Sequence, residues 1–91
     1  MSIRHNTYFN GKVQSLGFNH AGADFTVGVV MPGEYNFGKA ERRETICVVM
    51  GALSINGQWY MPDGATDCVI QPGEQIYIMT KGVTMYICQY M

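Results

Sequence analysis

The chain has 91 residues, of which 47% are apolar and only 14% are charged, and its formal net charge is −1. This length corresponds to one domain, residues 1–91, and the near-neutral charge gives no sign of a nucleic-acid-binding surface. No apolar run approaches the ~20 residues that a membrane span requires, and the N-terminus lacks the apolar stretch of a signal peptide. We therefore expect a cytoplasmic domain that contacts neither nucleic acid nor membrane.

Residue pairs typical of turns divide the chain into short stretches rich in Val, Ile, Thr, Tyr and Phe, a spacing typical of an all-β sandwich or barrel. The turn signals are Asn10-Gly11, Ala21-Gly22, Pro32-Gly33, Asn56-Gly57, Pro62-Asp63-Gly64, Pro72-Gly73 and Lys81-Gly82. The strands predicted between them are Lys12–Phe18, Phe25–Met31, Glu34–Gly38, Thr45–Met50, Ala52–Ile55, Gln58–Met61, Asp67–Ile70, Gln75–Met79 and Thr84–Tyr90.

The sharpest local prediction is a hairpin at residues 53–60. Asn56-Gly57 supplies the two positive-φ residues of a type I′ turn, whose twist matches that of the flanking strands. No segment has a sustained helical period, and only Gly38–Arg43 could form a single helical turn.

Cysteine and histidine patterns do not indicate a metal site. Cys47, Cys68 and Cys88 are widely spaced, lie in apolar surroundings and form no CxxC pair, so we expect buried free thiols in a reducing cytosol. His5 and His20 have no partner at ligand spacing.

The segment from Gly33 to Gly51 resembles the first conserved motif of cupins, in which a His-x-His pair and a glutamate stand between two glycines. Here Lys39-Ala40-Glu41 stand where His-x-His would be, Glu44 follows, and Thr84 falls where the last histidine ligand would lie. The fold that this resemblance implies is a single cupin-type barrel, that is, a double-stranded β-helix or jelly roll, without the usual metal ligands.

Residues 7–18 resemble the opening of the small pyrimidine/purine nucleoside phosphorylases, and residues 27–31, 33–37, 51–53 and 86–90 continue the similarity in register. The similarity weakens between Ser54 and Thr84. It implies a metal-free cytosolic homodimer that cleaves the N-glycosidic bond of nucleosides with phosphate, giving free base and ribose 1-phosphate. Inorganic phosphate is then the co-substrate, and no cofactor is expected.

Cations are scarce, which narrows the candidates for binding phosphate. Lys39, Arg42 and Arg43 lie on the motif that lines the mouth of a cupin, and Arg suits bidentate phosphate binding while Lys supplies a point charge. The alternative for the two arginines is a solvated loop beside Glu41 and Glu44. These two carboxylates are the candidate catalytic residues, which could bind ribose hydroxyls or stabilise an oxocarbenium-like charge, or could merely neutralise the neighbouring cations.

Tyr35 and Tyr77 are the candidates for a stacking platform under the base, against the alternative that most aromatic residues belong to the core. The low charge content favours a subunit interface, and an N-terminal edge strand is one place where a partner could pair. A non-catalytic cupin that binds a sugar or nucleoside, and an interaction module, remain alternatives to the enzyme because fold does not fix function.

Overall fold

The computed structural model describes residues 2–64 and 66–91, and within these ranges it contains ten strands and no helix. The strands are β1 (Arg4–Tyr8), β2 (Val13–His20), β3 (Ala23–Val30), β4 (Gly33–Lys39), β5 (Glu44–Met50), β6 (Leu53–Ile55), β7 (Gln58–Tyr60), β8 (Cys68–Ile70), β9 (Gln75–Thr80) and β10 (Thr84–Tyr90). No helix long and apolar enough to cross a membrane occurs in the described residues.

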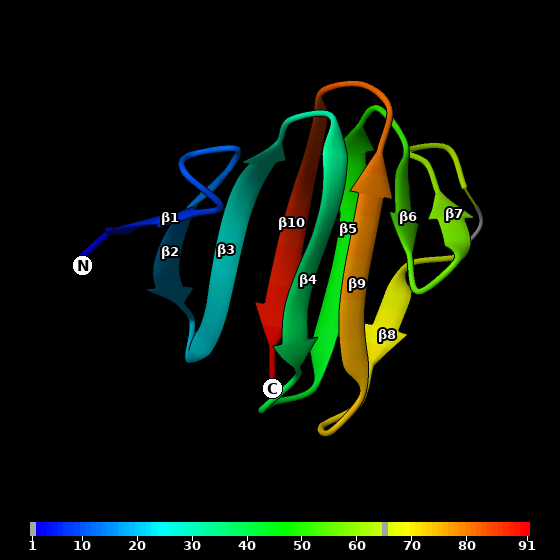
Figure 1. Cartoon of the computed structure of the whole chain (residues 1–91). Coiled ribbons are helices and arrows are strands. Elements are labelled where there is room, and N and C mark those ends of the chain that lie inside the picture. Colours follow the sequence, from blue (N-terminus) through cyan, green and yellow to red (C-terminus); the bar gives the residue numbers. More distant parts are fainter. Residues whose placement is uncertain (1, 65) are drawn as a thin grey trace.

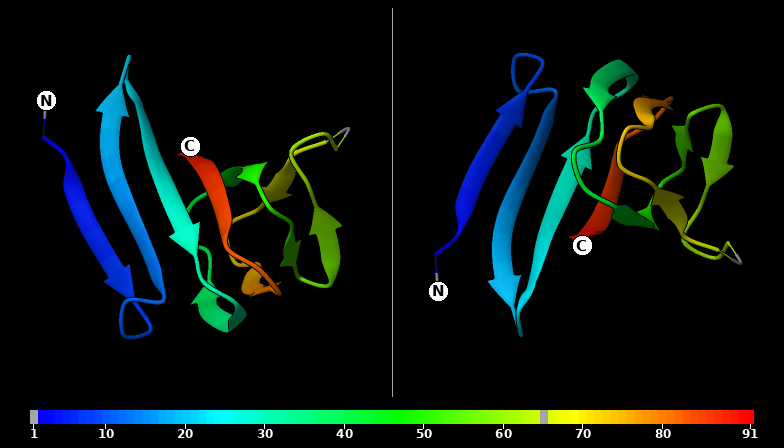
Figure 2. Two further views of the ribbon diagram at one scale, coloured as in Figure 1. Left: turned by 90° about the horizontal axis from the view of Figure 1, so that it is seen from above. Right: turned by 90° about the horizontal axis from the view of Figure 1, so that it is seen from below.

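The strands form two antiparallel sheets that lie face to face, with β4 and β9 in front of β10 and β5 in Figure 1. The larger sheet has six strands in the order β1-β2-β3-β10-β5-β8, and the smaller has four in the order β4-β9-β6-β7. The hairpins β1–β2 and β6–β7 lie at opposite ends of the molecule (Figure 2). In the part of the chain that the structure describes, no strand of one sheet pairs with a strand of the other to close a barrel, so the architecture is an open two-layer sandwich.

The core lies between the sheets because alternate residues of each strand point inward. Its members are Val13, Val30, Tyr35, Ala40, Ile46, Val48, Leu53, Ile55, Cys68, Ile70, Ile78 and Cys88. All three cysteines are free, as expected, and Cys68 and Cys88 are buried. Cys47 is only half-buried, because it points to the opposite side of β5 from Ile46 and Val48.

The predicted strands are confirmed to within a few residues, and the hairpin has positive φ angles of 51° at Asn56 and 88° at Gly57. One expectation and one omission need correction. The segment Gly38–Arg43 contains no helical turn, since β4 continues to Lys39 and the chain then bends into β5. The first strand, Arg4–Tyr8, was not predicted, because its mainly polar residues show no apolar alternation.

Gly28 determines where one aromatic ring lies. In the larger sheet, Gly28 is directly opposite Tyr86 of the neighbouring strand. A Cβ atom at position 28 would come within 2.4 Å of the Tyr86 ring. The missing side chain therefore allows the Tyr86 ring to lie against β3 and to face the space between the sheets.

Candidate functional site

A cavity of about 490 Å³ opens between the two sheets. Its walls are mostly apolar and aromatic, whereas its charged side chains come from the end of β4 and from the segment that leads into β5. The lining residues are Tyr8, Ser15, Phe37, Lys39, Ala40, Glu41, Arg42, Glu44, Ile46, Leu53, Ile76, Ile78, Tyr86, Cys88 and Tyr90.

The segment that carries the charges is held in place by its backbone. The amide of Ala40 donates to the carbonyl of Glu74 at 2.8 Å, and the amide of Gly73 donates to the carbonyl of Ala40 at 2.8 Å. Because Ala40 is buried and bonded on both sides, its neighbours Lys39 and Glu41 are carried to the edge of the cavity, where both are exposed.

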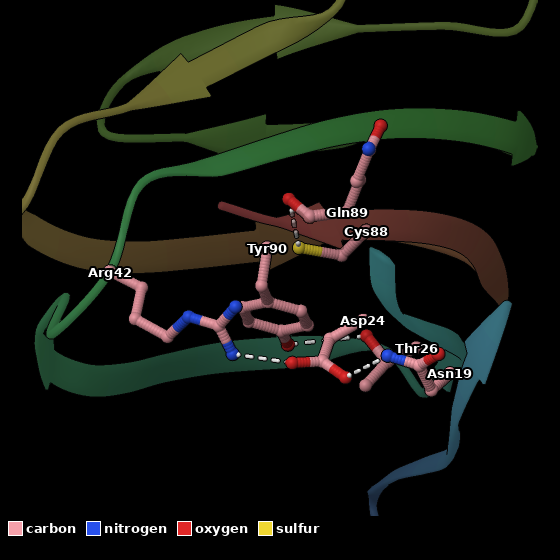
Figure 3. A network of polar contacts seen from close by, with 7 residues as sticks. All are labelled: Asn19, Asp24, Thr26, Arg42, Cys88, Gln89 and Tyr90. Carbon is pink, nitrogen blue, oxygen red and sulfur yellow. Dashed lines mark hydrogen bonds and ion pairs between the residues drawn. The ribbon is translucent and has the colours of Figure 1, made fainter. Parts of the chain in front are cut away.

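Arg42 is oriented at this edge by contacts with two strands of the larger sheet. Its Nη1 donates to Oδ2 of Asp24 at 2.9 Å, and its guanidinium lies 5.6 Å from the centre of the Tyr90 ring. Figure 3 shows Asp24 between Arg42 and Asn19, whose amide donates to the other carboxylate oxygen at 3.0 Å. The Asn19 amide and the Arg42 guanidinium hold the pKa of Asp24 below its ordinary value of 3.8.

The hydrogen bond to Asp24 uses only part of the hydrogen-bonding capacity of Arg42. A guanidinium carries five N–H donors, and Nη1 is the donor in the single ion pair found among the described residues. Donors therefore remain for an anion at the cavity. Lys39 forms no ion pair with any residue in the described ranges, so its ammonium offers a second positive charge at the same edge.

Glu44 differs from Glu41 in being half-buried, with its carboxyl group inside the cavity. Burial raises the pKa of Glu44 above its ordinary value of 4.5, although the Cys88 thiol and the Arg42 charge act in the opposite direction. Sγ of Cys88 donates to Oε1 of Glu44 at 3.4 Å. Burial and the charge of Glu44 raise the pKa of Cys88 to about 12, so this thiol stays protonated and acts as a donor.

Four aromatic side chains line the cavity. Tyr8 and Phe37 pack edge to face with their ring centres 5.4 Å apart. Tyr86 and Tyr90 come from β10, and the hydroxyl group of Tyr90 is hydrogen-bonded to Thr26 at 3.2 Å. Burial raises the pKa of both β10 tyrosines, so their hydroxyl groups are neutral. These rings offer an apolar, flat-sided environment between the charged edge and the core.

Four of the seven site residues predicted from sequence are brought together here: Lys39, Glu41, Arg42 and Glu44 line one cavity. Sequence reasoning did not assign Tyr8, Phe37, Tyr86 or Tyr90 to the site. A usable signal was present in β10, where Tyr86, Cys88 and Tyr90 recur with a period of two and therefore share a face. Gly28, which lies opposite Tyr86 in the sheet, was a second signal, because a glycine within a strand indicates that another group approaches the backbone closely.

The other three predicted residues do not line the cavity. Tyr35 shares a face of β4 with Phe37, but its ring is core and its hydroxyl group donates to the carbonyl of Met31 at 2.8 Å. Tyr77 lies between the inward-facing Ile76 and Ile78, so strand alternation turns it outward, where it bonds to Glu34. Arg43 is exposed, and its carbonyl accepts from the amide of Met91 at 2.9 Å.

The residues at the usual cupin ligand positions do not fit a metal. Lys39 is a poor metal ligand because its ammonium group is charged. Thr84 does not line the cavity, and its hydroxyl group is hydrogen-bonded to that of Thr80 at 2.8 Å within the core. Within the described ranges, no group of three or more His, Cys, Asp or Glu side chains could hold a metal ion.

The two facing antiparallel sheets with a cavity between them have a cupin-like fold. A solved cupin-2 domain from Rhodospirillum rubrum aligns over 97% of this chain and 68% of its own length with a TM-score of 0.63 at 12% identity, a likeness of fold alone. Residues 3–90 match the family model described as pyrimidine/purine nucleoside phosphorylase. The chain belongs to this family.

Full-length relatives agree with this assignment. A pyrimidine/purine nucleoside phosphorylase from Vibrio parahaemolyticus is 38% identical over 95 aligned residues that cover 100% of both chains. A crystal structure of a protein of unknown function from Vibrio parahaemolyticus superposes with a TM-score of 0.84 at 38% identity, again over 100% of both chains.

Proposed function

We propose that this chain is a nucleoside phosphorylase, which cleaves the N-glycosidic bond of purine and pyrimidine nucleosides with phosphate and releases free base and ribose 1-phosphate. Membership of the family supports the choice of reaction. The observation that carries the proposal is that two cations, two carboxyl groups and four aromatic rings line one cavity. Phosphate is the co-substrate, and no further cofactor is part of the proposal.

Phosphate binds at the edge of the cavity, between Lys39 and Arg42. Asp24 and the Tyr90 ring already hold the guanidinium in place, so binding an anion freezes little additional side-chain freedom. A hydrogen bond to a charged group contributes about 1.5–3 kcal/mol. Loss of either cation should therefore weaken phosphate binding roughly 10- to 100-fold.

The nucleoside occupies the inner part of the cavity with its base among the aromatic rings. Rings accept any base because every base has a flat π-face, which fits a reaction with both purine and pyrimidine nucleosides. Glu41 is exposed beside Lys39 and can accept hydrogen bonds from the ribose hydroxyl groups.

Glu44 supplies the proton that the departing base needs. In the reaction, a phosphate oxygen forms a bond to C1′ as the C1′–N bond breaks, and the electron pair of that bond moves to the base. The carboxyl group of Glu44 gives its proton to the base, and its burial among apolar residues favours the protonated form before the reaction. The carboxylate that results accepts the hydrogen bond of the Cys88 thiol.

The test is a turnover assay with uridine, inosine and adenosine, in the presence and absence of phosphate. We expect base release only with phosphate, together with an equal amount of ribose 1-phosphate. The Lys39→Ala variant should need a much higher phosphate concentration, whereas Lys12→Ala, which removes a cation that does not line the cavity, serves as the matched control. Nucleoside binding without turnover would refute the enzyme and support the non-catalytic binding cupin. Neither binding nor turnover would refute both and leave an interaction module.

A further inference from the structure

The inner face of the larger sheet extends beyond the smaller sheet. In Figure 1, β1, β2 and β3 lie to one side of β4, so part of their inner face is not covered by the smaller sheet. We call the inward side of these three strands (Arg4–Tyr8, Val13–His20 and Ala23–Val30) the wing. The cavity reaches the wing, because Tyr8 and Ser15 line the cavity from β1 and β2.

The wing is polar where it leaves the cavity. The strand register places Asn6 opposite Ser15 and Arg4 opposite Gly17. Residues two apart along a strand point to the same side of the sheet, and so do residues that are paired across two strands. Arg4 and Asn6 therefore share the side of Ser15, and the amide of Asn6 donates to the hydroxyl group of Ser15 at 3.3 Å. A ligand that extends out of the cavity along β2 would meet these polar groups.

The side chain of Arg4 lies above Gly17 because the glycine leaves room for it. A Cβ atom at position 17 would be 2.9 Å from Nη2 of Arg4 and 3.4 Å from its Cζ. Ser15 is two residues from Gly17 on the same face of β2, a separation of about 7 Å. The guanidinium of Arg4 is therefore held on the wing, about 7 Å from the wall of the cavity.

The positive charge of Arg4 has no ion-pair partner in the part of the chain that the structure describes. The carboxylate on the wing is Asp24, and its two oxygens accept hydrogen bonds from Asn19 at 3.0 Å and from Arg42 at 2.9 Å. These two hydrogen bonds lower the pKa of Asp24, and the charge of Arg4 lowers it further. Arg4 thus keeps its donors for an anion.

The spacing of the two arginines matches two phosphate groups on one ribose. Gly17 lies beneath Arg4, and Asp24 holds Arg42. Strands about 4.8 Å apart that rise about 3.4 Å per residue put these two anchoring residues about 8 Å from each other. A ribose ring spans a similar distance between groups attached at C1′ and at C5′. If inorganic phosphate lies beside Arg42 and C1′, a phosphate on C5′ would lie at Arg4.

We propose that Arg4 on the wing binds the 5′-phosphate of a nucleoside 5′-monophosphate whose base and ribose occupy the cavity. The assignment rests on the proposed function, because it takes from that function the positions of the inorganic phosphate and of the ribose. It adds a class of ligand, since nucleotides then bind the same cavity as nucleosides and bind it more tightly. Arg suits this role because its planar guanidinium makes bidentate contacts with phosphate.

The test is isothermal titration calorimetry in a phosphate-free buffer, with uridine and uridine 5′-monophosphate as ligands. The quantity compared is the ratio of the two Kd values. We expect the wild-type chain to bind the monophosphate about tenfold or more tightly than uridine, and Arg4→Ala to bring the ratio close to one. Arg43→Ala is the matched control, since it removes an exposed cation that does not line the cavity. Far-ultraviolet circular dichroism verifies that each variant is folded.

A second variant moves Arg4 without removing its charge. In Gly17→Ala the added Cβ atom would displace the guanidinium from the strand, so the preference for the monophosphate should decrease. Gly82→Ala is the control, because an added Cβ atom there meets no atom within 4 Å. Arg4→Lys should keep part of the preference, because lysine retains the charge but loses the bidentate contact.

Equal affinities of the wild-type chain for the two ligands, or binding of neither, overturn the proposal. A preference that Arg4→Ala leaves intact and Arg42→Ala removes overturns it too, because the 5′-phosphate would then lie at the edge of the cavity. The turnover assay separates this result from the proposed function. Phosphate-dependent base release by a chain that binds both ligands equally would refute the nucleotide site alone, and tight monophosphate binding without turnover of any nucleoside would refute the phosphorylase alone.

Discussion

Replacing Gly28 by alanine tests the placement of Tyr86 against β3, and with it the shape of the cavity. The new Cβ atom would lie 2.4 Å from one carbon of the Tyr86 ring and 2.5 Å from a second carbon and from the hydroxyl oxygen. Carbon atoms in contact normally stay about 3.5–4.0 Å apart. The ring must therefore move by about 1 Å or more, away from β3 and into the cavity.

The expected loss of stability follows from two opposing effects. Overpacking in a filled site costs about 1–3 kcal/mol, whereas alanine gains about 0.5–1 kcal/mol over glycine in a strand by restricting the unfolded chain. The net loss is about 1–2 kcal/mol. In a domain of this size each kcal/mol shifts the thermal midpoint by about 4–8 °C, so the midpoint should fall by roughly 5–15 °C.

The assay is thermal unfolding of Gly28→Ala beside a control variant, Gly82→Ala, where an added Cβ meets no atom within 4 Å. In a Tyr86→Ala background the Gly28→Ala change should cost little, because the ring that it displaces is gone. The reasoning is refuted if Gly28→Ala unfolds at the wild-type temperature, or if its cost is the same in both backgrounds.

The remaining predictions concern Glu44 and the aromatic rings. Glu44→Gln should lower kcat by about 100-fold or more, because glutamine has no proton to give to the base; unchanged kcat would exclude Glu44 as the acid. Burial raises the pKa of Glu44 in the folded chain above the ordinary value of 4.5. Just above pH 4.5 the folded chain therefore holds this proton more often than the unfolded chain does. The free energy of unfolding that Glu44 contributes falls as the pH rises through its folded-state pKa. Thermal midpoints across this range should fall more in the wild type than in Glu44→Gln, and equal slopes would contradict the raised pKa. Phe37→Leu should raise KM for the nucleoside about tenfold by removing a stacking surface, whereas Tyr77→Phe should leave it unchanged, and the reverse pattern would place the base outside the cavity.

The strands could be predicted because turn residues mark their ends and β-branched residues are frequent in their interiors. Asn56-Gly57 fixes its hairpin locally, through the φ angles that it favours. The strand Arg4–Tyr8 could not be found in the same way. It is an edge strand with mostly exposed polar side chains, and it forms because β2 pairs with it rather than because of its own pattern.

Sequence reasoning found the part of the site whose residues are neighbours in the sequence. Lys39, Glu41, Arg42 and Glu44 are close in sequence, so a single bend places all four at one cavity. The aromatic walls come from β1, β4 and β10, whose proximity depends on the sheet order. Alternation in β10 groups Tyr86, Cys88 and Tyr90 on one face, but it does not show by itself that this face turns inward, because Met85 and Ile87 make the opposite face apolar as well.

The central claim is that phosphate binds at Lys39 and Arg42, and the neighbouring arginines test it most directly. Arg42 lines the cavity and Arg43, next in the chain, does not. Measured in one phosphorolysis assay, Arg42→Ala should raise KM for phosphate roughly 10- to 100-fold while Arg43→Ala leaves it near the wild-type value. Equal effects of the two substitutions, or a larger effect of Arg43→Ala, would contradict the proposed site.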